Sequence, residues 1–205
     1  MSKEFIKEIK KGISEMCNKV GFNKNKQDLY YIKPYTENVA AILHFGFYTH
    51  QMSGHILVDV SIGVSYKNVE ELYCKLCEIA NSTYDFTIIR QIGYLMPERH
   101  YKDWDFVEGD DNTGVFEDLL RQIKTYGFDY VESMKDFNNL FKAFEMGTSI
   151  LNVSRDRRLP ILYYLKGEKE KGLKFIEEAL ERQQHGGVEE FDLDYPDFAE
   201  KYKAL

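Results

Sequence analysis

Residues 39–50 run Val-Ala-Ala-Ile-Leu-His-Phe-Gly-Phe-Tyr-Thr-His, and residues 55–66 run His-Ile-Leu-Val-Asp-Val-Ser-Ile-Gly-Val-Ser-Tyr. Both segments alternate apolar and polar side chains, which is the pattern of a half-buried β-strand. The four residues between them, Gln51-Met52-Ser53-Gly54, have a normal length for a hairpin loop. We therefore predict an antiparallel hairpin over residues 39–66.

The hairpin has two chemically different faces when His50 is placed opposite His55. The apolar face then holds Leu43, Phe45, Phe47, Val58, Val60 and Ile62. The other, called the polar sheet face, holds His44, Gly46, Tyr48, His50, His55, Asp59, Ser61 and Ser65, with Leu57 as its one apolar member. A sheet covered on one side needs this segregation, and a slip of one residue would destroy it.

Further elements follow on both sides of the hairpin. Residues 2–20 predict a helix capped by Ser2 and ended by Gly21, residues 26–33 a strand, and residues 69–80 a helix capped by Asn68. Residues 86–95 predict a strand, and residues 97–112 an irregular loop. The remainder predicts helices: one from residue 114 ended by Gly127, one after Ser133, a hairpin over 159–166 and 168–184 turning at Gly167, and a short one at 196–203.

The order of these elements, with no repeat and no Pro/Ser-rich linker between the halves, favours one folded α+β domain over residues 1–205. It is strand-rich over 1–97 and helical over 113–205, with an antiparallel sheet covered on one face by helices. The chain has 205 residues, 43% of them apolar, and a formal net charge of −7. This acidic balance argues against nucleic-acid binding, which needs Lys and Arg to neutralise phosphates. No apolar run approaches the ~20 residues that cross a membrane, and no signal peptide is evident, so we expect a cytoplasmic protein.

The loop over residues 97–112 is one candidate site, because long irregular segments in compact domains are often binding loops. Residues 103–118 contain seven acidic residues and no basic one. Such a segment could attract a basic protein partner. The proposed partner-binding residues are Arg99, His100, Trp104, Asp110 and Asp111.

The polar sheet face is the second candidate, with His44, Tyr48, His50, His55, Asp59 and Ser61 as its members. His50 and His55 could approach each other, but zinc needs at least three protein ligands, and Asp59 is about 13 Å from His55 along an extended strand. We therefore assign no metal site, and no catalytic residues.

The remaining motifs favour structural roles. Cys74 and Cys77 form a C-x-x-C pair, but they lie in the middle of a predicted helix, away from the helix start that would activate a thiol. The EF-hand pattern fails near Glu108, because Thr113 and Leu119 occupy the positions of its Gly and Glu. No glycine-rich phosphate loop is present, so we expect no cofactor.

The order of elements over residues 1–65 resembles the DUF4304-type family of bacterial proteins of unknown function. The similar features are a helix, then Gly21-Phe22 followed by lysines, an aromatic strand and an alternating meander. That resemblance implies no functional residues. The segment from Tyr164 to Leu180 is similar to the turn of a tetratricopeptide unit, but one unit makes no solenoid, so we predict an ordinary helical hairpin.

Two hypotheses follow. The first, which we favour, is a non-enzymatic cytoplasmic interaction module of the immunity or accessory type, which binds a basic partner through an acidic and aromatic surface. The second is a small-ligand binder or hydrolase-like enzyme that uses the polar sheet face around His44, Tyr48 and Asp59. The sequence fixes neither the partner nor the oligomeric state.

Overall fold

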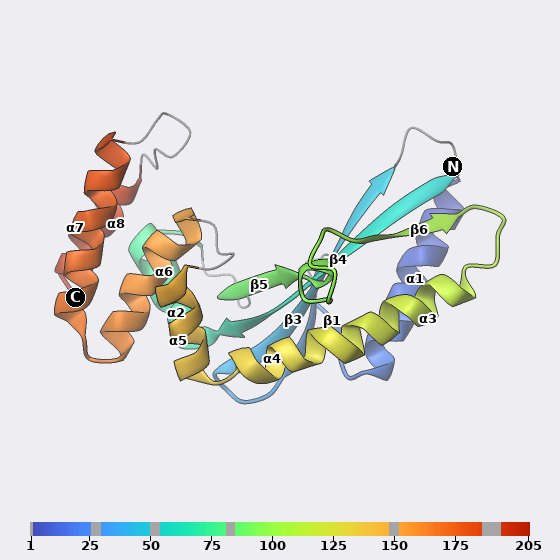
Figure 1. Cartoon of the computed structure of the whole chain (residues 1–205), viewed down its shortest axis with the longest axis horizontal. Coiled ribbons are helices and arrows are strands. Elements are labelled where there is room, and N and C mark those ends of the chain that lie inside the picture. Colours follow the sequence, from blue (N-terminus) through green and yellow to red (C-terminus); the bar gives the residue numbers. More distant parts are fainter. Residues whose placement is uncertain (1, 26–29, 50–53, 81–84, 148–151, 186–193) are drawn as a thin grey trace. The chain divides into compact units, whose positions relative to one another are not determined.

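The protein has an α+β fold, seen in a computed structural model that describes residues 2–25, 30–49, 54–80, 85–147, 152–185 and 194–205 (Figure 1). Its strands are β1 (Asn23–Lys24), β2 (Tyr30–Pro34), β3 (Val39–Thr49), β4 (His55–Tyr66), β5 (Ile88–Gln91) and β6 (Asp103–Val107). Among the described residues they form one antiparallel sheet in the order β1-β2-β3-β4-β5, with β6 also paired to β4. The predicted fold class is confirmed.

The helices are concentrated in the second half of the chain, as predicted. They are α1 (Lys3–Lys19), α2 (Lys67–Cys77), α3 (Thr113–Gln122), α4 (Phe128–Met134), α5 (Phe137–Met146), α6 (Asn152–Leu165), α7 (Lys169–His185) and α8 (Tyr195–Lys203). A π-helical turn, Ile123–Gly127, joins α3 to α4, and a 3-10 turn, Ile92–Tyr94, follows β5. None of the helices in the described ranges has the length and apolar character needed to cross a membrane.

The chain divides into two compact units, each made of two separate segments. The sheet unit consists of residues 1–64 and 88–135, and the helical unit of residues 65–87 and 136–205. The units do not coincide with the predicted strand-rich part, 1–97, and helical part, 113–205. The helix α2 belongs with the C-terminal helices, and α3 and α4 belong with the sheet. The assignment of residues 1–205 to one domain stays a prediction.

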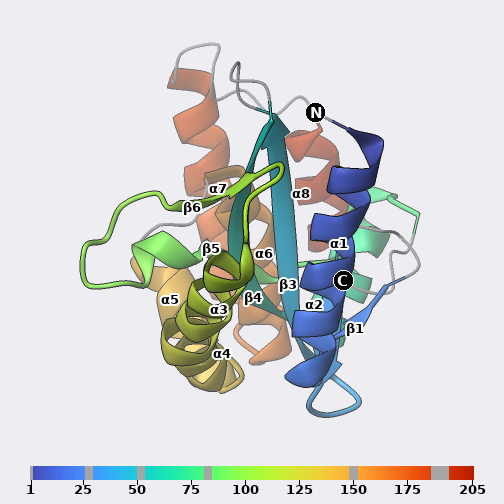
Figure 2. The same ribbon diagram turned by 90° about the vertical axis from the view of Figure 1, so that its right-hand side faces the viewer.

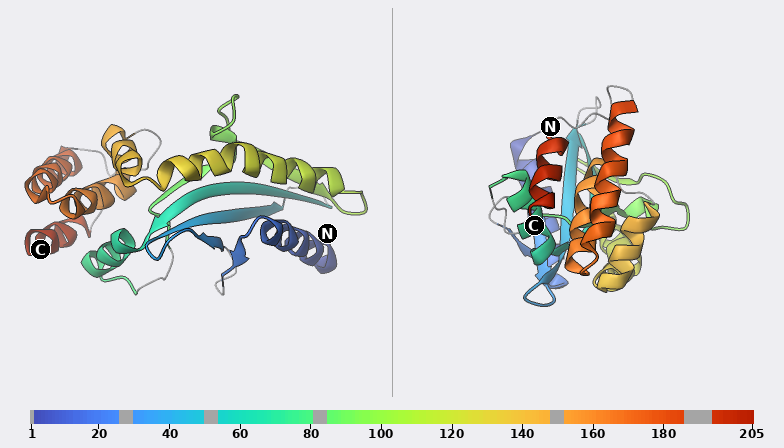
Figure 3. Two further views of the ribbon diagram at one scale, coloured as in Figure 1. Left: turned by 90° about the horizontal axis from the view of Figure 1, so that it is seen from below. Right: turned by 90° about the vertical axis from the view of Figure 1, so that its left-hand side faces the viewer.

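In the sheet unit, α1, α3 and α4 lie over the apolar face of the sheet (Figures 2 and 3). The Lys10 ammonium of α1 lies 5.3 Å from the centre of the Phe47 ring, and the Phe106 and Phe116 rings lie 4.8 Å apart. Phe45, Val58 and Val60 are 2%, 0% and 0% exposed. The predicted apolar face of the hairpin is therefore the face that the helices bury.

In the helical unit, buried polar contacts join the helices. Glu70 of α2 forms an ion pair with Arg158 of α6 at 2.7 Å, and both side chains are buried. The Tyr202 hydroxyl of α8 donates to the Pro160 carbonyl of α6 at 2.8 Å. Gly167, with φ of +77°, forms the predicted turn between α6 and α7, because the left-handed conformation favours glycine.

Gly127 does not end a helix, contrary to the prediction. Its φ is −68°, and the backbone continues without interruption into α4. A Cβ at this position would lie 3.0 Å from the Ile62 Cδ1 atom of the sheet. The glycine therefore serves the close approach of the helix to the sheet.

Three other boundaries differ from prediction, two of them because of local hydrogen bonds. The helix predicted to follow Ser133 begins after Asp136, whose carboxylate accepts the backbone N–H groups of Asn138 and Asn139. The helix α2 begins at Lys67 rather than after Asn68. The strand predicted over residues 86–95 ends at Gln91, because the Gln91 side chain accepts the Gly93 N–H and starts a 3-10 turn. The predicted irregular loop over 97–112 contains the strand β6.

Candidate functional site

The candidate site lies on the polar sheet face of the sheet unit, on the side opposite to α1, α3 and α4. Successive side chains of a strand point to opposite faces. Since Phe45 and Phe47 face the helices, His44 and Tyr48 of β3 lie on the other side, together with Asp59 of β4. His50 lies outside the described residues.

Asp59 is the centre of this face. Its side chain accepts hydrogen bonds from the Gly46 N–H at 2.9 Å, the Tyr101 hydroxyl at 3.2 Å and the Tyr48 hydroxyl at 3.5 Å. The residue is only 9% exposed, whereas Tyr48 is 52% and Tyr101 46% exposed. We call Gly46, Tyr48, Asp59 and Tyr101 the Asp59 cluster.

Gly46 makes the Asp59 cluster possible. A Cβ at Gly46 would overlap the Asp59 Oδ1 atom and would lie 2.9 Å from the Tyr48 hydroxyl oxygen. Because glycine has no side chain, the carboxylate and the phenol can both approach this strand. Sequence reasoning placed Gly46 on the correct face but gave it no role.

Tyr101 reaches Asp59 from the segment between β5 and β6, and sequence reasoning missed it. Gln91 holds this segment in place, because its side chain accepts the Gly93 N–H at 2.8 Å and also donates to the Lys102 carbonyl. A Cβ at position 93 would overlap the His100 carbonyl oxygen, so glycine allows the chain on both sides of this loop to approach closely. The Tyr101 ring is therefore positioned by its own loop as well as by Asp59.

The polar sheet face carries several carboxylates close together. In the register of β4 and β6, Asp59 lies directly opposite Asp103, and Leu57 lies opposite Asp105. The His55 ring pairs with Asp105 at 2.9 Å. No ion pair within the described ranges reaches Asp59 or Asp103. Two acidic residues therefore lie directly opposite each other on this face, an arrangement that destabilises a strand pair when both are charged.

Burial and the charge of Asp59 shift the pKa values of Tyr101, Tyr48 and His44. Burial, and then the charge of Asp59, raise the pKa of Tyr101 to about 12. The charge of Asp59 is the main cause that raises the pKa of Tyr48. Burial lowers the pKa of His44, which the charge of Asp59 opposes. At neutral pH the two phenols are therefore protonated, and they act as donors to the carboxylate.

The predicted members of the polar sheet face are only partly brought together. Tyr48 and Asp59 are in contact, and His44 interacts electrostatically with Asp59 while its ring packs against Tyr30 at 5.5 Å. His55 is engaged with Asp105, and Ser61 is half-buried opposite Gln91 of β5. In the part of the chain that the structure describes, no group of three or more His, Cys, Asp or Glu residues is placed to hold a metal ion.

The assignment of Trp104 to an exposed binding loop is wrong. Trp104 lies in β6 opposite Val58, on the apolar face of the sheet, and is 4% exposed. Its indole N–H donates to Asp118 at 2.8 Å. Because the ring is buried and its polar atom is satisfied, Trp104 holds β6 against α3.

The other members of the predicted partner-binding set are exposed. Arg99, with φ of +51°, and His100 lie in the loop before Tyr101. Asp110 is exposed, and the Asp111 carboxylate accepts the Thr113 N–H at 2.9 Å, at the start of α3. Asp111 therefore favours the helix start, as an acidic residue does there.

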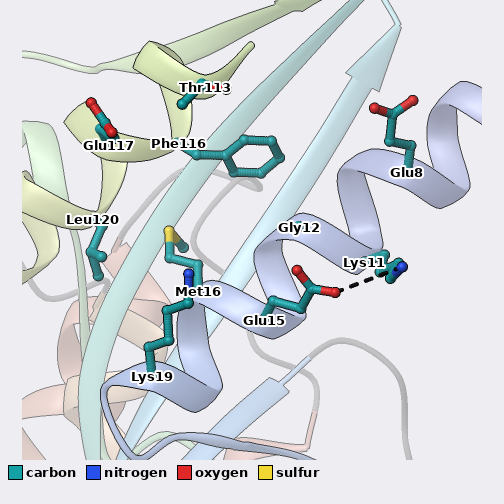
Figure 4. Close-up of a pocket in the computed structure, with 10 residues that line it drawn as sticks. All are labelled: Glu8, Lys11, Gly12, Glu15, Met16, Lys19, Thr113, Phe116, Glu117 and Leu120. Carbon is teal, nitrogen blue, oxygen red and sulfur yellow. Dashed lines mark ion pairs between the residues drawn. The ribbon is translucent and has the colours of Figure 1, made fainter. Parts of the chain in front are cut away.

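A groove lies between α1 and α3 in the sheet unit and has a volume of about 420 Å³ (Figure 4). Its lining residues are Glu8, Lys11, Gly12, Glu15, Met16, Lys19, Thr113, Phe116, Glu117 and Leu120. The Phe116 ring lies where a Cβ of Gly12 would be. Acidic and basic residues alternate along its α1 rim, so the groove favours neither charge.

The cysteines have structural surroundings. Cys17 is buried, and burial raises its pKa to about 12. Cys74 is buried in α2, and the Arg157 guanidinium donates to the Cys77 sulfur at 3.0 Å. The C-x-x-C pair lies in the last turn of α2 rather than in the middle of a helix, and it is away from the helix start, as expected.

A scan against family models finds no match for this chain, and neither do the searches of curated proteins and of solved structures. The resemblance to the DUF4304-type family stays a prediction.

Proposed function

We propose that the protein is a cytoplasmic, non-enzymatic interaction module whose polar sheet face binds a basic segment of a partner protein. The observation that carries the proposal is the pairing of Asp59 with Asp103 across β4 and β6, beside two half-exposed tyrosines. A cationic partner would relieve the repulsion between these carboxylates. The same partner could pack its side chains on the tyrosine rings.

The proposal keeps the acidic and aromatic surface of the first hypothesis but assigns it to other residues. The acidic part of the surface consists of Asp103 and Asp105 of β6, and the aromatic part consists of Tyr48 and Tyr101 instead of Trp104. Tyrosines are well suited to interfaces, because they offer a large contact area at a small entropy cost. Their hydroxyl contacts with Asp59 reduce that cost further.

The test is the binding of a labelled, flexible peptide rich in Arg and Lys, measured by fluorescence anisotropy at low and at physiological salt. The variant Asp103→Asn/Asp105→Asn should bind about two- to thirtyfold more weakly, since each exposed ion pair contributes about 0.2–1 kcal/mol. Added salt should reduce this difference.

The matched control is Glu8→Gln/Glu117→Gln, which removes the same charge from the rim of the α1–α3 groove. This control should bind as the parent protein does. An equal loss in both variants would mean that only the net charge attracts the peptide, and would contradict the proposed site.

The small-ligand alternative stays a prediction, for which the contact of Tyr48 with Asp59 is favourable.

A further inference from the structure

We infer that the Asp59 cluster accepts one arginine side chain of the basic partner, with its guanidinium group between the Tyr48 and Tyr101 rings. This inference rests on the proposed function and names the group that the site prefers. It depends on the arrangement of hydrogen-bond donors and acceptors around Asp59.

The cluster offers acceptors and no spare donors toward a ligand. Both phenolic hydroxyls donate their hydrogen to the Asp59 carboxylate, so the remaining lone pairs of both phenol oxygens can only accept. The carboxylate itself has about four acceptor positions and receives three hydrogen bonds here. A ligand with several N–H donors and a positive charge fits this pattern.

The two partly exposed tyrosines, joined at one carboxylate, favour a flat cation. Tyr48 and Tyr101 come from β3 and from the β5–β6 loop, and their hydroxyls converge on one carboxylate while about half of each residue stays exposed. A guanidinium is planar, stacks on aromatic rings and directs its N–H groups along its own plane, so it can contact a ring and an oxygen at the same time. It is also less strongly hydrated than an ammonium group, so it loses less free energy on entering a partly buried site.

The site is built before any ligand binds. Gly46 leaves the space that Asp59 and Tyr48 occupy, and Gln91 fixes the segment that carries Tyr101. Asp103, opposite Asp59, adds a second negative charge that a single cation could neutralise together with the first. A preorganised, charged and aromatic site of this kind should bind arginine more tightly than other cations, whereas a surface that is only acidic would bind them equally.

The experiment compares three peptides that are identical except for one central residue, which is arginine, lysine or the neutral isostere citrulline. Binding is measured with the full chain by titration calorimetry. The arginine peptide should bind about tenfold more tightly than the other two peptides. The lysine ammonium cannot stack flat on a ring and donate several N–H groups in the plane of that contact, and citrulline carries no positive charge.

Variants connect this preference to the cluster. Tyr101→Ala should bring the arginine peptide to the affinity of the lysine peptide, whereas Tyr101→Phe, which keeps the ring, should retain part of the preference. Asp103→Asn should weaken the arginine and lysine peptides alike. Thermal melting of each variant shows whether it is folded, and the Phe variant provides the comparison if the Ala variant unfolds.

The outcomes separate this inference from the proposed function. Equal affinity for the arginine and lysine peptides, with both weakened by Asp103→Asn, would overturn the arginine site and leave the basic-partner surface standing. An arginine preference that persists in Tyr101→Ala would also overturn the inference. If the parent protein binds none of the three peptides, both proposals are wrong.

Discussion

Gly46 shows how one residue can decide whether a site exists. Glycine in the interior of a strand costs about 0.5–1 kcal/mol relative to alanine, because it loses more conformational freedom on folding. At this position only glycine fits, since the Asp59 carboxylate and the Tyr48 hydroxyl occupy the volume that a Cβ would need. The backbone N–H of the same residue also donates to Asp59.

The first stability prediction concerns this glycine. Gly46→Ala should lower the free energy of unfolding by about 1–3 kcal/mol, because the added methyl group forces Asp59 and Tyr48 apart in a packed environment. It should also abolish the preference for the arginine peptide. Urea denaturation and the calorimetric titration measure the two effects.

Gly114→Ala is the matched control, because a Cβ at that position meets nothing within 4 Å and lies in the helix α3. The alanine should leave peptide binding unchanged and should stabilise the protein by up to about 1 kcal/mol through its higher helix propensity. If Gly46→Ala were as stable as the parent and kept the arginine preference, the space around Asp59 would not matter.

At the scale of elements, the hydrophobic pattern predicted the hairpin well and predicted β6 badly. The two faces of β3 and β4 could be separated because the alternation over Leu43–Tyr48 and Val58–Ile62 fits only one register. The strand β6 also alternates, as Asp-Trp-Asp-Phe-Val. It is short and follows a loop, so its acidic residues suggested a solvated segment and its tryptophan an exposed anchor, whereas pairing with β4 buries that ring.

Helix ends were less predictable, because packing determined some of them. Gly127 carries the local signal of a helix stop, yet it lies inside a continuous helical segment, where a Cβ would be only 3.0 Å from the Ile62 Cδ1 atom. Gly167 carries the same signal and does form a turn, because no such contact constrains it. A single sequence does not distinguish these two uses of glycine.

An ion pair between elements gives the second stability prediction. Glu70 of α2 and Arg158 of α6 are both buried, and Glu70 also accepts the Thr87 hydroxyl at 2.8 Å. Arg158→Met should reduce the free energy of unfolding by about 3–5 kcal/mol, because it leaves the Glu70 carboxylate buried without a cation. Chemical denaturation followed by circular dichroism measures the loss.

The double variant Glu70→Gln/Arg158→Met tests the physical reason. The glutamine carries no charge and can still accept the Thr87 hydroxyl, so most of the lost stability should return. If the double variant were as unstable as Arg158→Met alone, the packing of the arginine side chain on Tyr73, at 4.2 Å, would be the dominant contribution.

At the scale of the whole molecule, the candidate site draws on parts of the chain that only the fold brings together. Tyr48 and Asp59 could be placed on one face from the sequence, because they lie in adjacent strands of a predicted hairpin. Tyr101 is 42 residues from Asp59, in a loop without periodicity, so its hydroxyl contact could not be foreseen. The chain passes from the sheet unit to the helical unit before α2 and back to the sheet unit at the start of β5. No local sequence pattern marks these two crossings either.

The last prediction concerns both units and follows from their tyrosines. Burial is the first cause that raises the pKa of Tyr130 in the sheet unit and of Tyr202 in the helical unit to about 12, from 10.0. In the unfolded chain these phenols lose their protons near pH 10, two units below the folded state. Between these values the unfolded state binds fewer protons, so the free energy of unfolding must fall as pH rises.

We therefore expect the melting temperature to be nearly constant from about pH 8 to pH 9 and to fall steeply above about pH 10, with phenolate absorbance appearing together with unfolding. Tyr130→Phe should reduce the steepness of this fall, because the substituted ring no longer has a proton to lose on unfolding. Tyr202→Phe should do the same, but at a lower starting stability, since it removes the hydrogen bond to the Pro160 carbonyl. Phenolate absorbance that rises near pH 10 while the melting temperature stays constant would show that these hydroxyls are accessible to solvent in the folded protein, contrary to their burial.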